Sequence, residues 1–163
     1  MISYSPLNSS AIAVYVRCAP NEFGRKSKKM LTDEKRNRLI QKAVAARENA
    51  YAPYSNYQVG AALLTRSGKV YTGVNVENAA YSVTMCAERT AVFKAVSEGE
   101  KDFAAIAIAT DNAGYSCGSC RQVLAEFGLD TIVLVINGEG KVVDELTVAD
   151  LLPKAFSPAD LDS

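Results

Sequence analysis

The chain has 163 residues, of which 48% are hydrophobic, and its 18 basic residues balance 18 acidic ones. This length and apolar content are enough for one domain with a substantial core and too little for two. A neutral chain without a basic stripe has no electrostatic field that would draw it to nucleic acid or to an anionic membrane surface, so we expect a small or neutral partner.

The four cysteines show no even, loop-stapling pattern, which favours a reducing compartment such as the cytoplasm. Residues 11–16 are apolar. They lack a preceding basic region, however, and are shorter than the roughly 7 to 15 residues of a signal-peptide core. No apolar run approaches the roughly 18 residues of a membrane span. We therefore expect a cytoplasmic protein that neither enters a membrane nor carries a secretion signal.

The first 29 residues show neither helical nor strand periodicity and include the basic cluster Arg25-Lys26-Ser27-Lys28-Lys29. Such composition is typical of disordered segments. We expect an N-terminal extension over residues 1–29, followed by a single folded domain over 30–163. Because Met30 stands directly before the first predicted helix, a start of translation there is an open alternative.

The domain is expected to begin with a helix that has Thr32 as its N-cap, acidic residues in its first turn and apolar residues at helical spacing. Residues 51–56 break this helix. Two strands, at 57–64 and 69–75, then follow around a hairpin turn at Ser67-Gly68.

The rest of the chain alternates between helices and strands. In order, we expect a helix at 85–97, a buried strand at 103–109, a helix at 117–127, a strand at 131–136, a hairpin turn at 137–140, a strand at 141–146, and a short helix that begins near 147 and ends before Pro153. This alternation predicts an α/β fold, a three-layer α/β/α sandwich around a mixed five-stranded sheet.

The chain contains no histidine, so a transition metal would rest mainly on thiolates. Cys86, Cys117 and Cys120 lie where predicted helices begin, and soft thiolates at such spacing favour zinc. Three ligands leave one tetrahedral position open, as in catalytic zinc sites. Glu88 is placed to move the protons of a water activated there, and Arg89 is a cation that offsets the excess negative charge.

Simpler interpretations of these residues exist. Cys117 and Cys120 alone could form a redox dithiol, which would leave Cys86 and Glu88 unexplained. Cys18 could complete a structural zinc site, although it lies in the segment that we expect to be disordered. Glu88 alone could be a solvated acid that interacts favourably with a helix dipole.

Residues 86–90, Cys-Ala-Glu-Arg-Thr, and residues 117–122, Cys-Gly-Ser-Cys-Arg-Gln, closely resemble the small homo-tetrameric cytidine deaminases of the three-cysteine zinc class. The resemblance covers nearly all of residues 30–163. It includes five further motifs: Tyr51-Ala52-Pro53-Tyr54-Ser55, Val59-Gly60-Ala61-Ala62-Leu63, Asn75-Val76-Glu77-Asn78-Ala79, Lys94-Ala95-Val96-Ser97-Glu98-Gly99 and Leu151-Leu152-Pro153-Lys154-Ala155-Phe156.

The resemblance implies a cytidine deaminase-like catalytic domain that binds one zinc ion per subunit through Cys86, Cys117 and Cys120. It implies that Glu88 takes a proton from water and passes it to the pyrimidine N3 and then to the leaving amine. Arg89 would hydrogen-bond to the ligand thiolates.

For the substrate, the resemblance places Asn75 and Glu77 at the ribose hydroxyls and Ala87 at the bound nucleoside. Tyr57 stands where the family usually has Phe, beside the base and sugar, and we favour this position over a place in the core. Phe156 matches an aromatic residue that stacks on the base in a neighbouring subunit, so the homo-tetramer would share its active sites.

The implied function is hydrolytic deamination of cytidine and deoxycytidine in pyrimidine salvage. The alternatives are a deaminase of a cytosine-nucleoside antibiotic of the blasticidin S type, a polynucleotide-editing deaminase, and a non-enzymatic zinc or redox module. Three departures from the family pattern bear on substrate preference. The stretch 111–117 is two residues shorter than usual, Ser116 replaces Pro, and Val74 replaces a common Cys.

Overall fold

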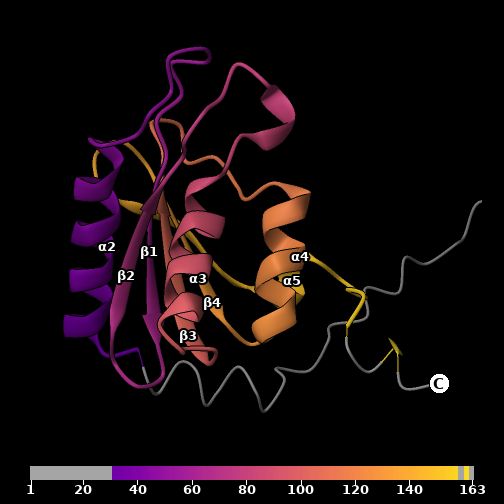
Figure 1. The fold of residues 1–163 in the computed structure, drawn as a ribbon. Helices are drawn as coiled ribbons and strands as arrows, with labels where there is room; N and C mark the ends of the chain where they lie inside the picture. Colours follow the sequence, from indigo (N-terminus) through magenta and orange to yellow (C-terminus); the bar gives the residue numbers. More distant parts are fainter. Residues whose placement is uncertain (1–30, 158–159, 162–163) are drawn as a thin grey trace, which may run out of the picture.

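The computed structural model describes residues 31–157 and 160–161, and Figure 1 shows their arrangement. A five-stranded sheet with the strand order β2-β1-β3-β4-β5 forms the centre. Its strands are β1 (Gly60–Thr65), β2 (Val70–Val74), β3 (Phe103–Ala109), β4 (Ile132–Ile136) and β5 (Val142–Thr147). The pair β3 and β4 is parallel and the other pairs are antiparallel, so the sheet is mixed, as predicted.

Helices cover both faces of the sheet (Figure 1). They are α2 (Asp33–Arg47), α3 (Ala87–Ser97), α4 (Gly118–Phe127) and the short α5 (Val148–Leu151), with a 3-10 turn, η1, at Tyr81–Val83. One core cluster packs Leu39 and Ala43 of α2 against one face of the sheet. A second cluster packs α3, α4 and α5 against the other face. The predicted three-layer α/β/α sandwich is therefore confirmed.

Local signals in the sequence set most element boundaries. The hydroxyl of Thr32 accepts a hydrogen bond from the backbone N–H of Lys35, as expected of an N-cap. Gly128, with a φ of 149°, ends α4. The strand β3 is buried along its whole length because helices cover both of its faces.

The first strand begins three residues later than predicted. Strand β1 starts at Gly60 rather than at Tyr57, because the side chain of Asn75 takes up the backbone groups that a ladder would use. The side-chain oxygen of Asn75 accepts from the N–H of Val59 at 2.9 Å, and its amide nitrogen donates to the carbonyl of Tyr57 at 2.8 Å. The segment before β1 is thus held mainly by the Asn75 side chain, together with one backbone hydrogen bond from the Asn75 N–H to the Val59 carbonyl at 3.2 Å.

The parallel pairing of β3 and β4 determines where the cysteine-bearing helices begin. Helix α3 leads into β3 and helix α4 leads into β4, and both helices lie on the same face of the sheet. Because the two strands run in the same direction, the N-termini of α3 and α4 lie at the same edge (Figure 1). The fold therefore brings Cys86 and Cys117 close together.

The predicted extension over residues 1–29, and Cys18 within it, lie outside the described residues. Within the part of the chain that the structure describes, no helix has the length and apolar character needed to cross a membrane.

Replacing Gly73 by alanine should destabilise the domain. An added methyl group would lie 2.3 Å from the carbonyl oxygen of Ala87 and 2.5 Å from the backbone nitrogen of Ala91, where α3 crosses β2. Overpacking of this kind costs about 2 kcal/mol, which corresponds to a fall in melting temperature of roughly 4–8 °C. Gly118→Ala is the control, because nothing lies within 4 Å of its added methyl group. Thermal unfolding of both zinc-loaded variants tests this, and equal melting temperatures would contradict the close approach.

Candidate metal centre and active site

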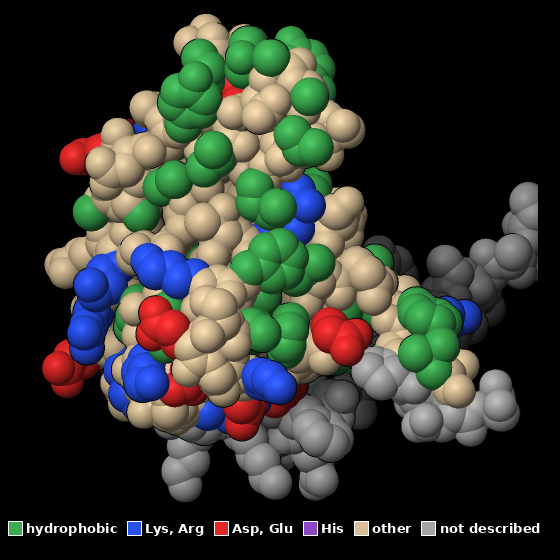
Figure 2. All heavy atoms as spheres, in the orientation of Figure 1, with side chains coloured by type: hydrophobic (Ala, Val, Ile, Leu, Met, Phe, Trp, Pro, Cys, Tyr) green, Lys and Arg blue, Asp and Glu red, His purple; other side chains and the backbone are tan. Residues whose placement is uncertain are grey.

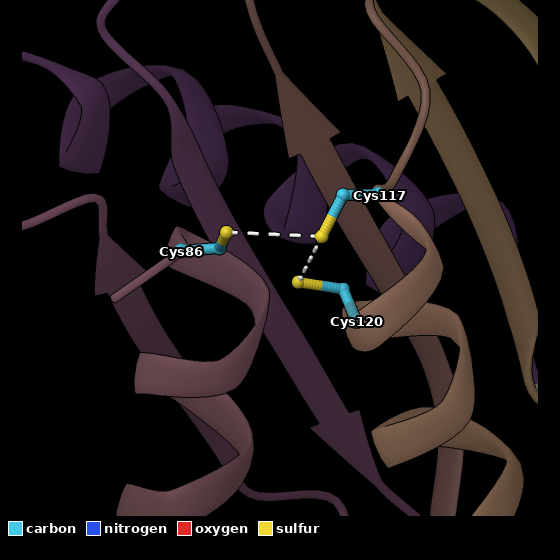
Figure 3. A group of neighbouring side chains, drawn as sticks. All are labelled: Cys86, Cys117 and Cys120. Atoms are coloured by element: carbon cyan, nitrogen blue, oxygen red, sulfur yellow. Dashed lines mark hydrogen bonds between the residues drawn. The ribbon is translucent and has the colours of Figure 1, made fainter. Parts of the chain in front are cut away.

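Three thiols meet where the N-termini of α3 and α4 converge (Figure 3). Cys86 is the N-cap of α3, Cys117 is the N-cap of α4, and Cys120 lies in the first turn of α4. Neither N-cap cysteine uses its side chain to cap its helix, so both sulfurs are free to face the shared space. The three Sγ atoms lie within 4.8 Å of one another.

The spacing of the sulfurs fits one tetrahedral zinc ion. The Sγ atoms of Cys86 and Cys117 are 3.9 Å apart, and those of Cys117 and Cys120 are 3.4 Å apart. A tetrahedral ion with Zn–S bonds of about 2.3 Å separates its sulfur ligands by about 3.8 Å. The three thiolates form a soft donor set, which also suits zinc. The fold thus brings the three predicted metal ligands together at one site.

The surroundings favour a thiolate at Cys86. Interaction with the Cys120 thiol and with the Arg89 guanidinium lowers the pKa of Cys86 to about 5. Nη2 of Arg89 lies 3.4 Å from the Cys86 sulfur and 3.4 Å from the carbonyl oxygen of Thr84. The interaction with Cys86, together with burial, raises the pKa of Cys120. In the absence of metal, negative charge therefore collects on Cys86.

Glu88 is buried beside the thiols, with 5% of its surface exposed. It lies in the first turn of α3. Burial raises the pKa of its carboxyl group, and the negative charge of Cys86 raises it further. A carboxyl group whose pKa is raised in this way is suited to taking up and releasing protons near neutral pH. The simpler interpretation of Glu88 as a solvated acid is wrong, because the side chain is not in solvent.

The residue before Cys117 also faces this space. Ser116 is 3% exposed, and its hydroxyl oxygen is buried without a hydrogen-bond partner among the described residues. The hydroxyl lies close enough to Glu88 to offset part of the rise in the pKa of that carboxyl group. The Ser116 carbonyl accepts a hydrogen bond from Nε of Arg121 at 2.8 Å. A buried hydroxyl without a partner is available to a ligand or to water. From the sequence, Ser116 was identified only as a replacement for the proline that the family usually has.

Glu77 lines a pocket whose wall includes Thr84, two residues before Cys86 in the chain. The pocket has a volume of about 310 Å³, and its walls are formed by Tyr54, Ser55, Glu77, Tyr81 and Thr84. The Glu77 carboxylate accepts hydrogen bonds from the N–H of Tyr54 at 2.9 Å, from the N–H of Ser55 at 3.2 Å and from the Ser55 hydroxyl. The Ser55 hydroxyl lowers the pKa of Glu77 most strongly, so this carboxylate is kept charged. The sequence did not identify Ser55, whose role depends on a contact across 22 residues.

The other predicted substrate residues take up varied positions. Asn75 is 8% exposed and already bonded to backbone, as described above. Tyr57 is 38% exposed, and its hydroxyl donates to the side chain of Asn112. Ala87 is the buried first residue of α3. Phe156 leaves 59% of its surface exposed, while its backbone carbonyl accepts a hydrogen bond from Gln122 of α4.

Comparison with known proteins agrees with this geometry. The family described as "Cytidine and deoxycytidylate deaminase zinc-binding region" matches residues 33–136. The chain belongs to this family. It is 52% identical over 130 residues to a cytidine deaminase of Halalkalibacterium halodurans, a match that covers 78% of this chain and 98% of that protein. A crystal structure of cytidine deaminase from Burkholderia pseudomallei superposes with a TM-score of 0.70 at 49% identity, covering 77% of this chain and 99% of that one.

A more distant relative has a different named substrate. A blasticidin-S deaminase of Bacillus cereus is 34% identical over 113 residues, which cover 63% of this chain and 79% of that protein. Relatives that are more similar to this chain carry the name cytidine deaminase.

In the zinc-free protein, Cys86 should react with iodoacetamide down to about pH 5, whereas Cys120 should stay unmodified at about pH 6. The lowered pKa of Cys86 leaves it as the reactive thiolate above pH 5, and its reactivity is lost as the pH falls through that value. Arg89→Leu removes a stabilising cation and should shift the reactivity of Cys86 to higher pH. Peptide mass spectrometry across the pH range measures this. A midpoint for Cys86 near the ordinary thiol value of about 8.5 would contradict it.

Proposed function

We propose that the chain catalyses the hydrolytic deamination of cytidine and deoxycytidine to uridine and deoxyuridine, with release of ammonia. The observation that carries the proposal is the cluster of three thiols at two converging helix N-termini, with the buried carboxyl group of Glu88 beside it. Membership of the deaminase family and the names of similar relatives support cytidine as the substrate.

Cys86, Cys117 and Cys120 would hold the zinc ion, and a fourth coordination position would remain for the reaction. When bound, zinc supplies a Lewis acid that activates water at neutral pH. Three thiolates carry more negative charge than the ion carries positive charge. Arg89 and the two helix N-termini offset this excess and so keep the site able to activate water.

Glu88 is the proton carrier in this proposal. Its carboxylate takes a proton from the attacking water and delivers it to N3 of the pyrimidine ring while the new C–O bond forms at C4. Glu88 then carries the second proton of that water, from the hydroxyl added at C4, to the exocyclic amine. The C4–N bond breaks, the C4 carbonyl of the uracil ring forms, and ammonia leaves. The raised pKa of Glu88 suits both directions of transfer.

The nucleoside would lie between the metal centre and the pocket that Glu77 lines. Glu77 retains acceptor capacity for a ribose hydroxyl, and Asn75 retains one amide hydrogen. Ala87 offers a backbone N–H in the first turn of α3, where helical N–H groups lack intrahelical partners. Tyr57 would contact the nucleoside through its partly exposed ring.

We further propose a homo-tetramer that works in the cytoplasm in pyrimidine salvage, with residues 30–163 as the catalytic domain. Exposed apolar side chains support an association between copies, and Figure 2 shows many of them on the upper half of one face. Large apolar side chains that are exposed in the described part of the chain include Val76, Tyr81, Val83 and Phe93. The exposed ring of Phe156 would then complete the active site of a neighbouring subunit.

The purified protein should convert cytidine to uridine, and removal of zinc by a chelator should abolish the conversion. The fall in cytidine absorbance measures the reaction, and added zinc should restore it. Blasticidin S, incubated with the same preparation, should be turned over much more slowly. Turnover of blasticidin S without turnover of cytidine would favour the antibiotic deaminase instead.

Glu88→Gln should lower kcat by at least about 10²- to 10⁴-fold, because the amide fills the same space but cannot carry a proton. The variant should keep one zinc per chain, measured by metal analysis. Glu34→Gln is the matched control, since Glu34 also lies in the first turn of a helix but is exposed and remote from the thiols. If Glu88→Gln retained full activity, the proton-carrier role would be excluded.

A further inference from the structure

The loop at residues 110–116 leads directly from β3 into the metal-site residue Cys117. Contacts from distant elements hold both of its ends. Asp111 forms an ion pair with Arg47 of α2, and its carbonyl accepts a hydrogen bond from the N–H of Gly138 at 3.1 Å. Near the other end, the Tyr115 hydroxyl donates to Asp144 of β5 at 2.8 Å.

The middle of this loop is held by Tyr57. The Tyr57 hydroxyl donates to Oδ1 of Asn112 at 2.6 Å. The same oxygen accepts from the Thr110 hydroxyl at 3.4 Å, and the Thr110 hydroxyl oxygen accepts from the N–H of Gly114 at 2.6 Å. These bonds form a small network in which Asn112 joins Tyr57 to the turn that precedes Cys117.

The shape of the loop fits the tyrosine closely. A methyl group added at Gly114 would lie 2.3 Å from the Tyr57 hydroxyl oxygen. Ala113 has a φ of 56°, in the left-handed region that side chains rarely adopt. A short loop in such a conformation needs contacts that fix it, and the Tyr57 hydroxyl supplies one.

The other end of Tyr57 is also fixed. Its backbone carbonyl accepts a hydrogen bond from the Asn75 side chain at 2.8 Å, and its N–H donates to the Ser55 hydroxyl at 3.0 Å. Tyr57 therefore links Asn75, which directly follows β2, to the loop that precedes Cys117.

We propose that Tyr57 is a positioning residue for the metal centre: its hydroxyl, through Asn112, fixes the 110–116 loop and with it the sulfur of Cys117. The inference rests on the proposed zinc site. The single hydrogen of the Tyr57 hydroxyl is donated to Asn112, so it is not free to recognise the nucleoside. The hydroxyl thus acts on the reaction through the metal ligand, while the ring remains available to the substrate.

Two substitutions remove the bond from opposite sides, and a third preserves it. Tyr57→Phe removes the donor, Asn112→Leu removes the acceptor, and Asn112→Asp keeps an acceptor oxygen. The probe is Co²⁺ bound in place of zinc, because its absorption bands report the ligand geometry. A second readout is the rate at which a chromophoric chelator takes zinc from the protein. Neither readout requires turnover.

We expect both bond-removing variants to shift the cobalt bands and to release zinc about 3- to 10-fold faster, as loss of one hydrogen bond implies. The double variant should show no more than the larger single effect, and Asn112→Asp should behave like the wild type. With cytidine, kcat should fall in the bond-removing variants while KM stays nearly unchanged.

A Tyr57→Phe variant with wild-type cobalt bands and zinc release would overturn the proposal. If its KM rose at the same time, the hydroxyl would be shown to serve the substrate instead. Failure of the proposed function has a different signature. In that case, wild-type protein would bind cobalt and zinc without deaminating cytidine, and the two metal readouts would still decide the role of Tyr57.

Discussion

The parallel pairing of β3 with β4 is the constraint on which the rest of this structure depends. Ala105 pairs with Ile132, and the register continues to the pair of Ala109 and Ile136. The helices that precede these two strands pack on the same face of the sheet, so both helices must begin at the same edge of the sheet. Antiparallel pairing would have placed Cys86 and Cys117 at opposite edges. The metal centre is therefore a consequence of strand direction, which is set by core residues far from the chemistry.

Bringing three thiols and a carboxyl group together concentrates negative charge at one site, and the fold distributes this charge unequally among the four groups. Cys86, next to Arg89, has a lowered pKa, whereas Cys120 and Glu88 have raised ones. The two helix N-termini add partial positive charge without adding a group that could block the site. The negative charge that would let the thiolates hold a cation also adds to the rise in the pKa of the Glu88 carboxyl group, as the proposed exchange of protons requires.

Much of this could be predicted from the sequence, because it depends on local signals. Helix starts, buried strands and the cysteine spacing are all visible in short windows of residues. The late start of β1 could not be predicted in this way, because it depends on hydrogen bonds from the Asn75 side chain to backbone groups 16 and 18 residues earlier in the chain. The unpartnered hydroxyl of Ser116 and the bond between Tyr57 and Asn112 were also missed. Each requires knowing which residues face one another after the chain has folded.

The loop before Cys117 shows how such long-range contacts replace local stiffness. A proline before a metal ligand would fix the backbone by itself, since its ring restricts φ. Ser116 lacks that restriction, and the loop is instead tied to three separate elements through Asp111, Asn112 and Tyr115. Each tie reaches a different part of the domain, namely α2, the segment before β1, and β5. In our proposal, the position of Cys117 therefore depends on contacts that the loop makes with α2, with the segment before β1 and with β5.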